Sequence, residues 1–419
     1  MTDNSSGKLR VLVIATTFPK WENDQEPRFV HDLCQNLSDE VDIQVLAPHA
    51  PGAKERETWG KMEVIRFPYF YPRHLQNLCY DGGIIPKLKS SWLARLQLPF
   101  FLTFLFFRLI KITGETRFDL IHCHWLIPQG FFCALLKLLR GTPYLLTAHG
   151  GDVYSFKGLP VVPGLIKFAL KHSTLCTVNS QATRDQVLKS FKKAAVEVVP
   201  MGVDLEQFHP DNYSEKIKDS AGKENLLLLG VGRLAEKKGF KYLIEAMPLI
   251  LKEIPSARLA IIGFGPQKAQ LEKRIRELNL TASVFLTGGK KGKELRDWFA
   301  TADIFIGPSI ITPDGDTEGQ GVVFLEAMAS GTPVIASDVG GIKDAVRDGF
   351  SGLLVPEKNP QAIADKVLML AKDKPLRERL IKNALELVHT DYSWEQSGRN
   401  FLKIYQQCIE KKPNQFKSP

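Results

Sequence analysis

Strand-like apolar runs alternate with helical patterns along the whole chain, and this alternation limits the possible folds more than any other feature. The runs are rich in Leu, Ile and Val, which predicts strands buried on both faces and therefore parallel strands covered by helices. With short connections, such an alternation gives doubly wound α/β sheets. The expected strands are residues 9–16, 42–47, 62–67, 119–124, 143–148, 174–179 and 196–200, then 226–231, 258–263, 284–287, 304–307, 333–337 and 352–355.

A polar, charged stretch at residues 211–225 interrupts the alternation, which then begins again. A length of 419 residues also favours more than one domain. We therefore expect two sheets, in domains of residues 1–205 and 206–393. Residues 394–419 contain apolar side chains at helical spacing and are expected to form a helix that packs back toward the first domain. Two open sheets that face each other would form a cleft at the carboxyl ends of their strands, where ligands bind in such folds.

The formal net charge of +9 suits an anionic partner such as a nucleotide sugar, a phospholipid surface or a nucleic acid. Nucleic acid is disfavoured because no basic stripe is interleaved with stacking aromatic residues. The six cysteines include no CxxC pair, which is typical of buried, reduced thiols in a cytosolic protein. The first seven residues are polar, without the apolar core of a signal peptide. We expect a cytoplasmic protein.

Residues 96–112 form the most apolar segment, which is interrupted by Pro99 and Arg108 and is shorter than the ~20 residues of a spanning helix. One interpretation is a core helix. The other is an interfacial helix, because Lys and Arg flank the Phe- and Leu-rich stretch as they do in helices that lie on anionic membranes. Under the second interpretation the protein would be peripheral at the cytosolic face of a membrane. The side chains expected to insert are Phe100, Phe101, Phe104, Phe106 and Phe107.

Residues 230–239, GVGRLAEKKG, directly follow an expected strand and place two cations at the carboxyl edge of the sheet. Arg233 offers a guanidinium fork and Lys238 a point charge, a pair that can neutralise a diphosphate. A solvated basic surface loop is the alternative.

Residues 318–326, EGQGVVFLE, are the most specific signal in the chain. Gly319 and Gly321 allow close approach of a ligand, and a helix that begins after them would present free N–H groups to an anion. Buried carboxylates need partners, and sugar hydroxyls suit Glu318 and Glu326 because one carboxylate accepts two of them. Stabilisation of the helix N-terminus by Glu318 is the alternative, but it does not explain Glu326.

Two further segments follow expected strands. Thr147-Ala-His-Gly-Gly-Asp152 would position the imidazole of His149 over the crevice, unless it only stabilises the turn. The glycine-rich segments 263–266, with Gly263 and Gly265, and 287–290 suit close approach by a nucleoside, although each is a weak signal alone.

The segments at residues 146–152, 230–239 and 318–337 resemble those of the family 4 glycosyltransferases, a retaining, glycogen-synthase-like group with the GT-B fold of two Rossmann-like domains facing across a cleft. The resemblance extends from FVHDL at residues 29–33 to DYSW at 391–394. The Gly-Gly loop that many members carry after the first strand is replaced here by residues 17–30, which leaves the acceptor side undefined. This longer loop resembles the subset that builds exopolysaccharides, teichuronic acids or lipid-linked oligosaccharides.

The resemblance implies roles for the residues singled out above. Arg233 and Lys238 would bind the diphosphate and stabilise it as leaving group, and Glu326 would hold the ribose. Glu318 and the backbone of Gly319–Gly321 would hold the donor sugar. His149 would contact the outer hydroxyls of that sugar. The implied catalytic residues are His149, Arg233, Lys238 and Glu318, and the implied substrate-binding residues are Asp152, Gly263, Gly265, Gly319, Gln320, Gly321, Val322 and Glu326.

No metal site or cofactor is expected. Asp314-Gly-Asp316 is the nearest approach to a metal-binding DxD pair, but its place before Glu318 indicates a role in shaping the loop. His122 and His124 lie at a strand end, and we assign them no metal on the ground that alternating strand residues point to opposite faces. Arg233 and Lys238 would then supply the charge of a cation.

The expected function is retaining transfer of a hexose-type sugar from a nucleotide-diphosphate donor to a glycan or lipid-linked acceptor in cell-surface polysaccharide synthesis. The alternatives are a nucleotide-sugar epimerase of the same fold, distinguished by epimerised donor in place of a transfer product, and a binding-only pseudo-enzyme in a membrane assembly complex. The co-occurrence of Arg233, Lys238, Glu318 and Glu326 disfavours the latter.

Overall fold

The computed structural model describes the chain except for residues 1–6, 23, 25–27, 81–82, 155–160 and 411–419. The described chain folds into two compact units. The first contains residues up to 179, 184–199 and the chain from 397 onward, and the second contains 180–183 and 200–396. The division therefore falls before the expected boundary at residue 205, because residues 200–205 pack with the second unit.

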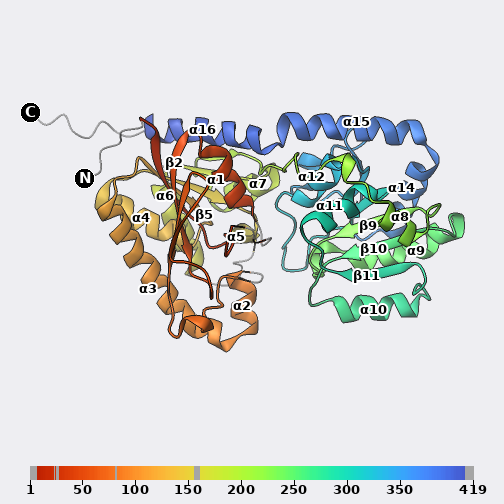
Figure 1. Cartoon of the computed structure of the whole chain (residues 1–419), viewed down its shortest axis with the longest axis horizontal. Coiled ribbons are helices and arrows are strands. Elements are labelled where there is room, and N and C mark those ends of the chain that lie inside the picture. The colour runs from red at the N-terminus through yellow and green to blue at the C-terminus, as the bar shows by residue number, and fades with distance from the viewer. Residues whose placement is uncertain (1–6, 23, 25–27, 81–82, 155–160, 411–419) are drawn as a thin grey trace, which may run out of the picture. The chain divides into compact units, whose positions relative to one another are not determined.

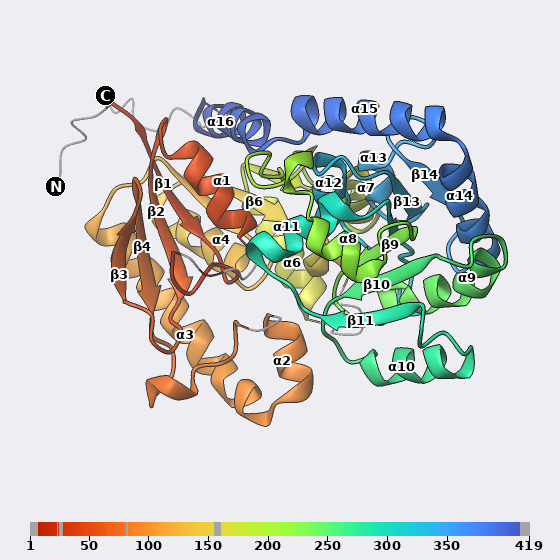
Figure 2. The ribbon, with the colours of Figure 1, turned by 45° about the vertical axis from the view of Figure 1, so that its right-hand side comes forward.

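The first unit contains an eight-stranded sheet in the order β3-β4-β2-β1-β5-β6-β7-β8. All pairs are parallel except β3–β4, which is antiparallel at the edge of the sheet (Figure 2). The strands are β1 (Leu9–Ile14), β2 (Val41–Pro48), β3 (Arg56–Trp59), β4 (Met62–Phe67), β5 (Leu120–His124), β6 (Tyr144–Ala148), β7 (Leu175–Val178) and β8 (Val196–Val198). The helices are α1 (Phe29–Leu37), α2 (Ile84–Ser90), α3 (Trp92–Glu115), α4 (Gln129–Arg140), α5 (Gly151–Tyr154), α6 (Val162–His172), α7 (Gln181–Ser190) and most of α16 (Trp394–Glu410), with a short 3₁₀ turn at Arg73–Leu75.

The second unit contains a six-stranded parallel sheet in the order β11-β10-β9-β12-β13-β14 (Figure 1). Its strands are β9 (Leu227–Val231), β10 (Arg258–Ile262), β11 (Val284–Gly288), β12 (Ile304–Gly307), β13 (Val334–Ser337) and β14 (Leu353–Val355). Its helices are α8 (Glu215–Ala221), α9 (Phe240–Glu253), α10 (Lys268–Glu277), α11 (Gly292–Thr301), α12 (Val322–Ala329), α13 (Ile342–Ala345), α14 (Pro360–Lys372) and α15 (Lys374–Asp391), with 3₁₀ turns at Pro210–Asn212 and Glu236–Lys238.

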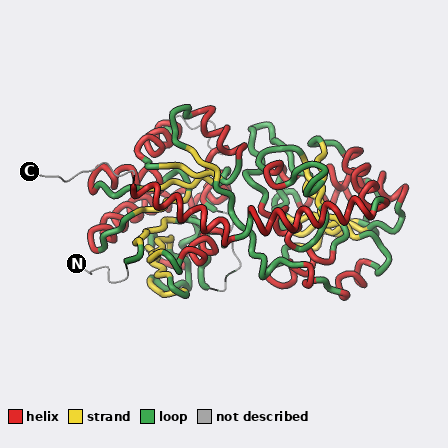
Figure 3. Tube along the Cα trace, turned by 90° about the horizontal axis from the view of Figure 1, so that it is seen from above, coloured by secondary structure: helices red, strands yellow, loops and turns green. Residues whose placement is uncertain are grey.

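The strands of the second sheet other than the edge strand β11 are largely buried on both faces, as their apolar sequences predict. In β9, Leu228 belongs to the core cluster on one face, whereas Leu227 and Leu229 belong to the cluster on the other. The helices that cover the two faces are seen in Figure 3. The expectation of parallel strands in two α/β sheets is confirmed. Among the strands of the described residues, β3 alone was not predicted from the sequence.

Both sheets change direction at one point. In the second, the chain moves outward from β9 through β10 to β11 and then returns to the other side of β9 with β12. In the first, it moves from β1 to β2 and β4 and returns with β5 beside β1. The loops after the two strands at such a switch point diverge, and the opening between them is where ligands bind in doubly wound sheets.

Candidate donor and sugar site

The switch point of the second sheet carries the two most specific motifs. Arg233 and Lys238 lie in the loop between β9 and α9, and Glu318 lies in the loop between β12 and α12. β9 and β12 are neighbours in the sheet, so two segments that are distant in the sequence meet at one edge. The sequence predicted both segments to be post-strand loops, and the strand order explains why they converge.

Backbone-to-backbone packing holds the first loop in place. A Cβ atom on Gly263 would lie 1.9 Å from the carbonyl oxygen of Gly232, and one on Gly265 would lie 2.3 Å from that of Leu234. Leu234 also donates its backbone N–H to Phe264 at 2.8 Å. Gly263 and Gly265 therefore position the loop that carries the two cations, a role different from the nucleoside contact expected of them.

Lys238 pairs with Glu318, its Nζ lying 3.2 Å from Oε1. Burial raises the pKa of Glu318, but attraction to Lys238 and Lys237 outweighs burial and places the pKa below its ordinary value. Lys237 in turn pairs with Asp316 at 3.3 Å. The carboxylate of Asp316 thus helps to hold the loop, as expected of the Asp314–Asp316 segment.

The pKa of Glu326 is shifted in the opposite direction from that of Glu318. Burial raises its pKa to about 7, and Lys238 offsets only part of that shift. The same ammonium group therefore acts on both carboxylates of the motif. Among the described residues, no hydrogen bond or ion pair reaches the Glu326 carboxylate, and none reaches the exposed guanidinium of Arg233. One carboxylate and one cation at this edge thus remain available to a ligand.

The segment between the two glutamates begins α12 with Val322 and leaves its first backbone N–H groups at the switch point. The side chain of Gln320 does not point to a ligand, because its amide accepts from the N–H of Met201 at 3.0 Å and donates to the Met201 carbonyl at 2.8 Å. Any contact of Gln320 with a substrate would therefore come from its backbone. Gly321, in the left-handed region at φ 75°, forms the turn into the helix.

The structure adds Gly340 and Gly341 to this site. The N–H of Gly341 donates to the carbonyl of Glu318 at 3.0 Å, and a Cβ atom on Gly341 would lie 1.9 Å from the carbonyl oxygen of Gly319. A Cβ on Gly340 would lie 2.2 Å from the carbonyl of Glu318. Sequence reasoning missed both residues, although a Gly-Gly pair two residues after the end of β13 was a visible signal.

In the first unit, His149 follows β6 and its ring lies among aromatic side chains. Its Nε2 is 2.9 Å from Nδ1 of His124, and its ring centroid is 4.8 Å from Phe29 and 5.1 Å from Trp125. Burial lowers the pKa of His149 to about 3, so the ring is neutral at physiological pH. Such an imidazole donates or accepts a hydrogen bond but does not supply positive charge.

Asp152 is buried and fixes the turn that carries His149. Its two oxygens accept from the backbone N–H groups of His149 and Leu126, each at 2.9 Å. Burial raises the pKa of Asp152 to about 6, against the opposing effect of these backbone donors. The side chain is thus committed to the protein backbone rather than to a substrate.

The reason given for assigning no metal to His122 and His124 was wrong. Residues two apart in a strand share a face, and the two ring centroids are 4.2 Å apart. His122 is instead hydrogen-bonded within the protein: Nδ1 lies 2.7 Å from the hydroxyl of Tyr405, and Nε2 lies 2.7 Å from that of Thr147. Within the described residues, no cluster of three or more His, Cys, Asp or Glu is arranged to hold a metal ion.

The loop after β1, which replaces the short Gly-Gly loop, is anchored by a buried arginine. Arg66 on β4 donates to the carbonyl of Pro19 at 2.6 Å and to the hydroxyl of Tyr80 at 3.3 Å. Its guanidinium lies 5.4 Å from the centre of the Trp59 ring. Part of the loop, at residues 23 and 25–27, lies outside the described residues.

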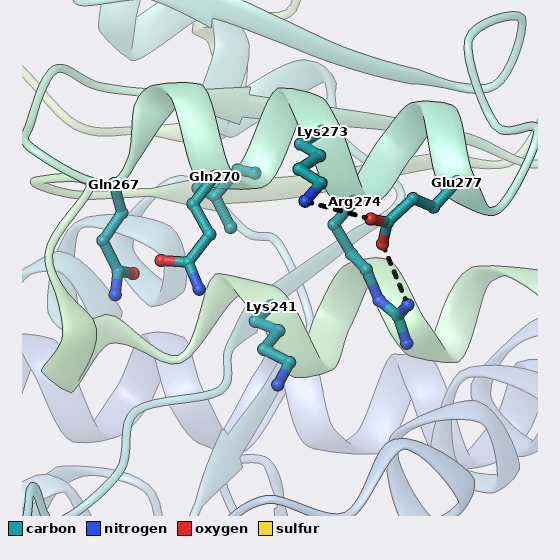
Figure 4. Close-up of a pocket in the computed structure, with 7 residues that line it drawn as sticks. Lys241, Gln267, Gln270, Lys273, Arg274 and Glu277 are labelled. Carbon is teal, nitrogen blue, oxygen red and sulfur yellow. Dashed lines mark hydrogen bonds and ion pairs between the residues drawn. The ribbon is translucent and has the colours of Figure 1, made fainter.

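A cavity of about 290 Å³ lies between α9 and α10 (Figure 4). It is lined by charged and amide side chains, but Arg274 is already paired with Glu245 at 2.8 Å and with Glu277 at 3.3 Å. Since no motif from the sequence falls in it, the cavity is not a candidate donor site.

Comparisons with known proteins agree with this geometry. Residues 27–207 match the family described as Glycosyltransferase Family 4, and residues 213–387 match Glycosyl transferases group 1. The chain is 30% identical over 292 residues to the GDP-mannose-dependent alpha-(1-6)-phosphatidylinositol monomannoside mannosyltransferase of Mycobacterium tuberculosis, covering 69% of this chain and 76% of that protein. The chain belongs to the family 4 glycosyltransferases.

A second relative of this glycosyltransferase is the amylovoran biosynthesis glycosyltransferase AmsK of Erwinia amylovora, 33% identical over 50% of each chain. Among solved structures, the sucrose-phosphate synthase of Thermosynechococcus elongatus superposes with a TM-score of 0.78 at 23% identity, covering 96% of this chain and all of that one. The fold is GT-B, with two Rossmann-like domains. The chain is thus a glycosyltransferase, as its motifs predicted.

Proposed function

We propose that this glycosyltransferase moves a hexose-type sugar, with retention of configuration and without a metal ion, from a nucleotide-diphosphate donor to a glycan or lipid-linked acceptor in cell-surface polysaccharide synthesis. The observation that carries the proposal is the position of Lys238, paired with Glu318 and electrostatically coupled to Glu326, in the loop that also exposes Arg233. This one loop supplies two cations for a diphosphate beside two carboxylates for sugar hydroxyls.

Each residue has a part in donor binding. The guanidinium of Arg233 and the ammonium of Lys238 bind the diphosphate and stabilise its charge as the bond to the sugar breaks. Glu326 accepts hydrogen bonds from the ribose hydroxyls, and Glu318 with the backbone of residues 319–322 holds the donor sugar. His149, a neutral imidazole, contacts the outer hydroxyls of that sugar. The two cations supply the charge that a divalent metal supplies in other transferases.

Retention follows if the acceptor attacks the face of the sugar from which the diphosphate departs. The departing phosphate oxygen then takes the proton of the acceptor hydroxyl. A double displacement would require an available carboxylate at the anomeric carbon, whereas Glu318 is held by Lys238 at 3.2 Å. This pairing supports the first route.

The relatives support the substrate classes. The mycobacterial relative is named for a GDP-mannose donor and a phosphatidylinositol mannoside acceptor, and the Erwinia relative for the synthesis of amylovoran. We propose a cytoplasmic enzyme that works at the cytosolic face of a membrane. All six cysteines are buried and none forms a disulfide, which suits a reducing compartment.

The test begins with a panel of nucleotide sugars, scored by protection against thermal unfolding and by transfer to lipid-linked and free glycan acceptors. With the donor found, Arg233→Ala and Lys238→Ala are each expected to lower kcat by roughly 10²–10³-fold, as loss of a preorganised charge does elsewhere. Lys252→Ala, an exposed lysine of α9, is the matched control.

Proton NMR of the product determines the anomeric configuration. Near-normal turnover in both variants would contradict the assignment of the cations, and an inverted product would contradict the retaining route. Epimerised donor without a transfer product would favour the epimerase alternative.

A further inference from the structure

Helix α3 is apolar all round, but the first unit covers only one side of it. The covered side consists of Ala94, Gln97, Phe101, Leu105, Leu109 and Ile112. Phe101 lies in the core, with its ring centroid 5.5 Å from Phe67 and 5.4 Å from Tyr69. On this side α3 is a core helix, which is one of the two interpretations of residues 96–112 given above.

The opposite side of α3 carries large apolar side chains that the described protein leaves in solvent. At spacings of three and four residues they form one stripe along the helix. Their exposed fractions are 74% for Trp92, 48% for Leu96, 46% for Phe100, 49% for Phe104 and 63% for Phe107. A contiguous stripe of this size is typical of an interaction surface and not of a monomer's ordinary surface.

The stripe differs from the set of phenylalanines expected from the sequence. Phe101 is fully buried and cannot insert into anything. Phe106 is partly buried, with its ring centroid 5.4 Å from that of Phe132 on α4. Phe100, Phe104 and Phe107 remain, and Trp92 and Leu96 join them.

The charged residues of the segment that carries the stripe are almost all cations. From Ile84 to Gly114 the sequence contains five cations and no Asp or Glu. Lys89 and Arg95 are exposed near one end of the stripe, and Lys111 is exposed near the other. Lys111 has a surface pair with Glu115 at 3.8 Å, with both side chains more than half exposed. An anionic surface complements this arrangement over the length of the helix.

We propose that the stripe, defined as Trp92, Leu96, Phe100, Phe104 and Phe107, docks the enzyme on an anionic phospholipid surface with α3 lying in the plane of the interface. By length and composition alone α3 could cross a membrane, because it has 24 residues and an 18-residue stretch within it has a mean hydropathy of 1.6. The contacts of Phe101 with Phe67 and Tyr69 hold its other side in the core, which favours an in-plane position. Apolar side chains at the acyl boundary with cations at the headgroups are the arrangement of interfacial helices.

The surface fits lipid better than a second copy of this chain. Two copies joined through the stripe would bring five cations of each copy together without a carboxylate between residues 84 and 114 to compensate them. Anionic headgroups supply that compensation, and each nearby Lys or Arg strengthens binding about fivefold. The inference does not rest on the donor chemistry proposed above.

The test is co-sedimentation of the full chain with vesicles of phosphatidylcholine alone and with an equimolar mixture of phosphatidylcholine and phosphatidylglycerol. We expect binding to the anionic vesicles that weakens as salt is raised.

Two double variants test the two parts of the surface. Phe104→Ala/Phe107→Ala removes the apolar side chains that would insert, and Phe285→Ala, at a 44% exposed phenylalanine of the second unit, is its control. Lys89→Glu/Lys111→Glu is expected to weaken binding by at least an order of magnitude, on the basis of about fivefold per cation. Lys252→Glu is the matched charge control.

Each variant is checked for correct folding by its circular dichroism and its affinity for the donor, both of which should match those of the unmodified protein. Several outcomes would overturn the proposal: no sedimentation with anionic vesicles at low salt, equal binding to both kinds of vesicle, or binding that the phenylalanine variants leave unchanged. Concentration-dependent association in sedimentation velocity that disappears in Phe104→Ala/Phe107→Ala would assign the stripe to a second copy of the chain.

Discussion

Nδ1 of His124 lies 2.9 Å from Nε2 of His149, so two neutral imidazoles share one hydrogen bond beneath the turn after β6. Burial lowers the pKa of both rings, that of His149 to about 3. Among the described residues Nε2 of His124 has no hydrogen-bond partner. A buried N–H without an acceptor is costly, which favours an unprotonated Nε2. His124 then donates from Nδ1, and His149 carries its own proton on Nδ1, where the proposed donor sugar would accept it.

The first prediction concerns this pair. His124→Leu removes the donor that fixes the orientation and tautomer of His149, and kcat is expected to fall about tenfold, the equivalent of one hydrogen bond. His124→Asn keeps an N–H donor near the same place and is expected to retain most of the activity. Steady-state kinetics provide the measurement. Equal losses in the two variants would show that His124 acts only through packing, and unchanged activity in His124→Leu would remove its role altogether.

The second prediction is a pH dependence set by Glu326. The ionised carboxylate accepts both ribose hydroxyls, so donor affinity should rise as pH passes through the pKa of about 7. Stability should change in the opposite sense. Between the ordinary value of 4.5 and about 7 the folded protein holds a proton that the unfolded chain releases, so the free energy of unfolding falls as pH rises. Titration of donor binding from acid to alkaline pH, in parallel with Glu326→Gln, measures the first effect. A pH dependence that survives in Glu326→Gln would assign it to another group.

The third prediction concerns the glycine that sequence reasoning missed. Gly341→Ala places a methyl group 1.9 Å from the carbonyl oxygen of Gly319, so the loop must move. We expect at least a tenfold loss of donor affinity, equivalent to about 1.4 kcal/mol. Gly164→Ala is the control, because its Cβ would meet nothing within 4 Å and it lies in α6. Isothermal titration with the donor nucleotide compares the two, and equal affinities would exclude a role for the Gly340–Gly341 contact.

The fourth prediction is that turnover persists in excess EDTA, because Arg233 and Lys238 are proposed to supply the charge at the diphosphate. Activity is measured with and without chelator, after dialysis. Loss of activity that manganese or magnesium restores would contradict the proposal.

The fifth prediction compares the contributions to stability of a buried arginine, Arg66 on β4, and an exposed one, Arg56 on the neighbouring strand β3. Arg66→Ala leaves the buried Tyr80 hydroxyl and the Pro19 carbonyl without their donor, and each buried polar group left unsatisfied typically costs about 1–3 kcal/mol. Arg56→Ala removes a surface pair with Glu63 and should cost about 0–1 kcal/mol. Urea unfolding of both variants measures the difference. A similar loss in the two would mean that Arg66 does not hold the loop after β1.

The sequence predicted the parallel strands because most of them are rich in Leu, Ile and Val, and sheets covered on both faces require such apolar strands. It missed β3, whose sequence Arg-Glu-Thr-Trp is mostly polar and whose position is an edge. An edge strand with one buried residue lacks the pattern that identifies central strands.

The donor motifs were predictable as loops, but their internal contacts were not. Gln320 was expected to face the substrate, yet it binds the backbone of Met201, which is 119 positions away in the sequence. Gly340 and Gly341 form their contacts with residues 318–319 only after β13 has been placed beside β12. Contacts between segments that the topology brings together cannot be read from local spacing. The proximity of the His122 and His124 rings was a different case, since strand periodicity correctly applied would have predicted it.

The hydrogen bond between His122 on β5 and Tyr405 on α16 has a consequence for biosynthesis. Phe401 and Tyr405 are fully buried in the unit whose sheet begins at residue 9. A ribosome must therefore translate the entire second unit before the first can close its core. The first unit can therefore complete the packing of α16 on β5 only after the second unit has been made, although most of the first unit is translated earlier.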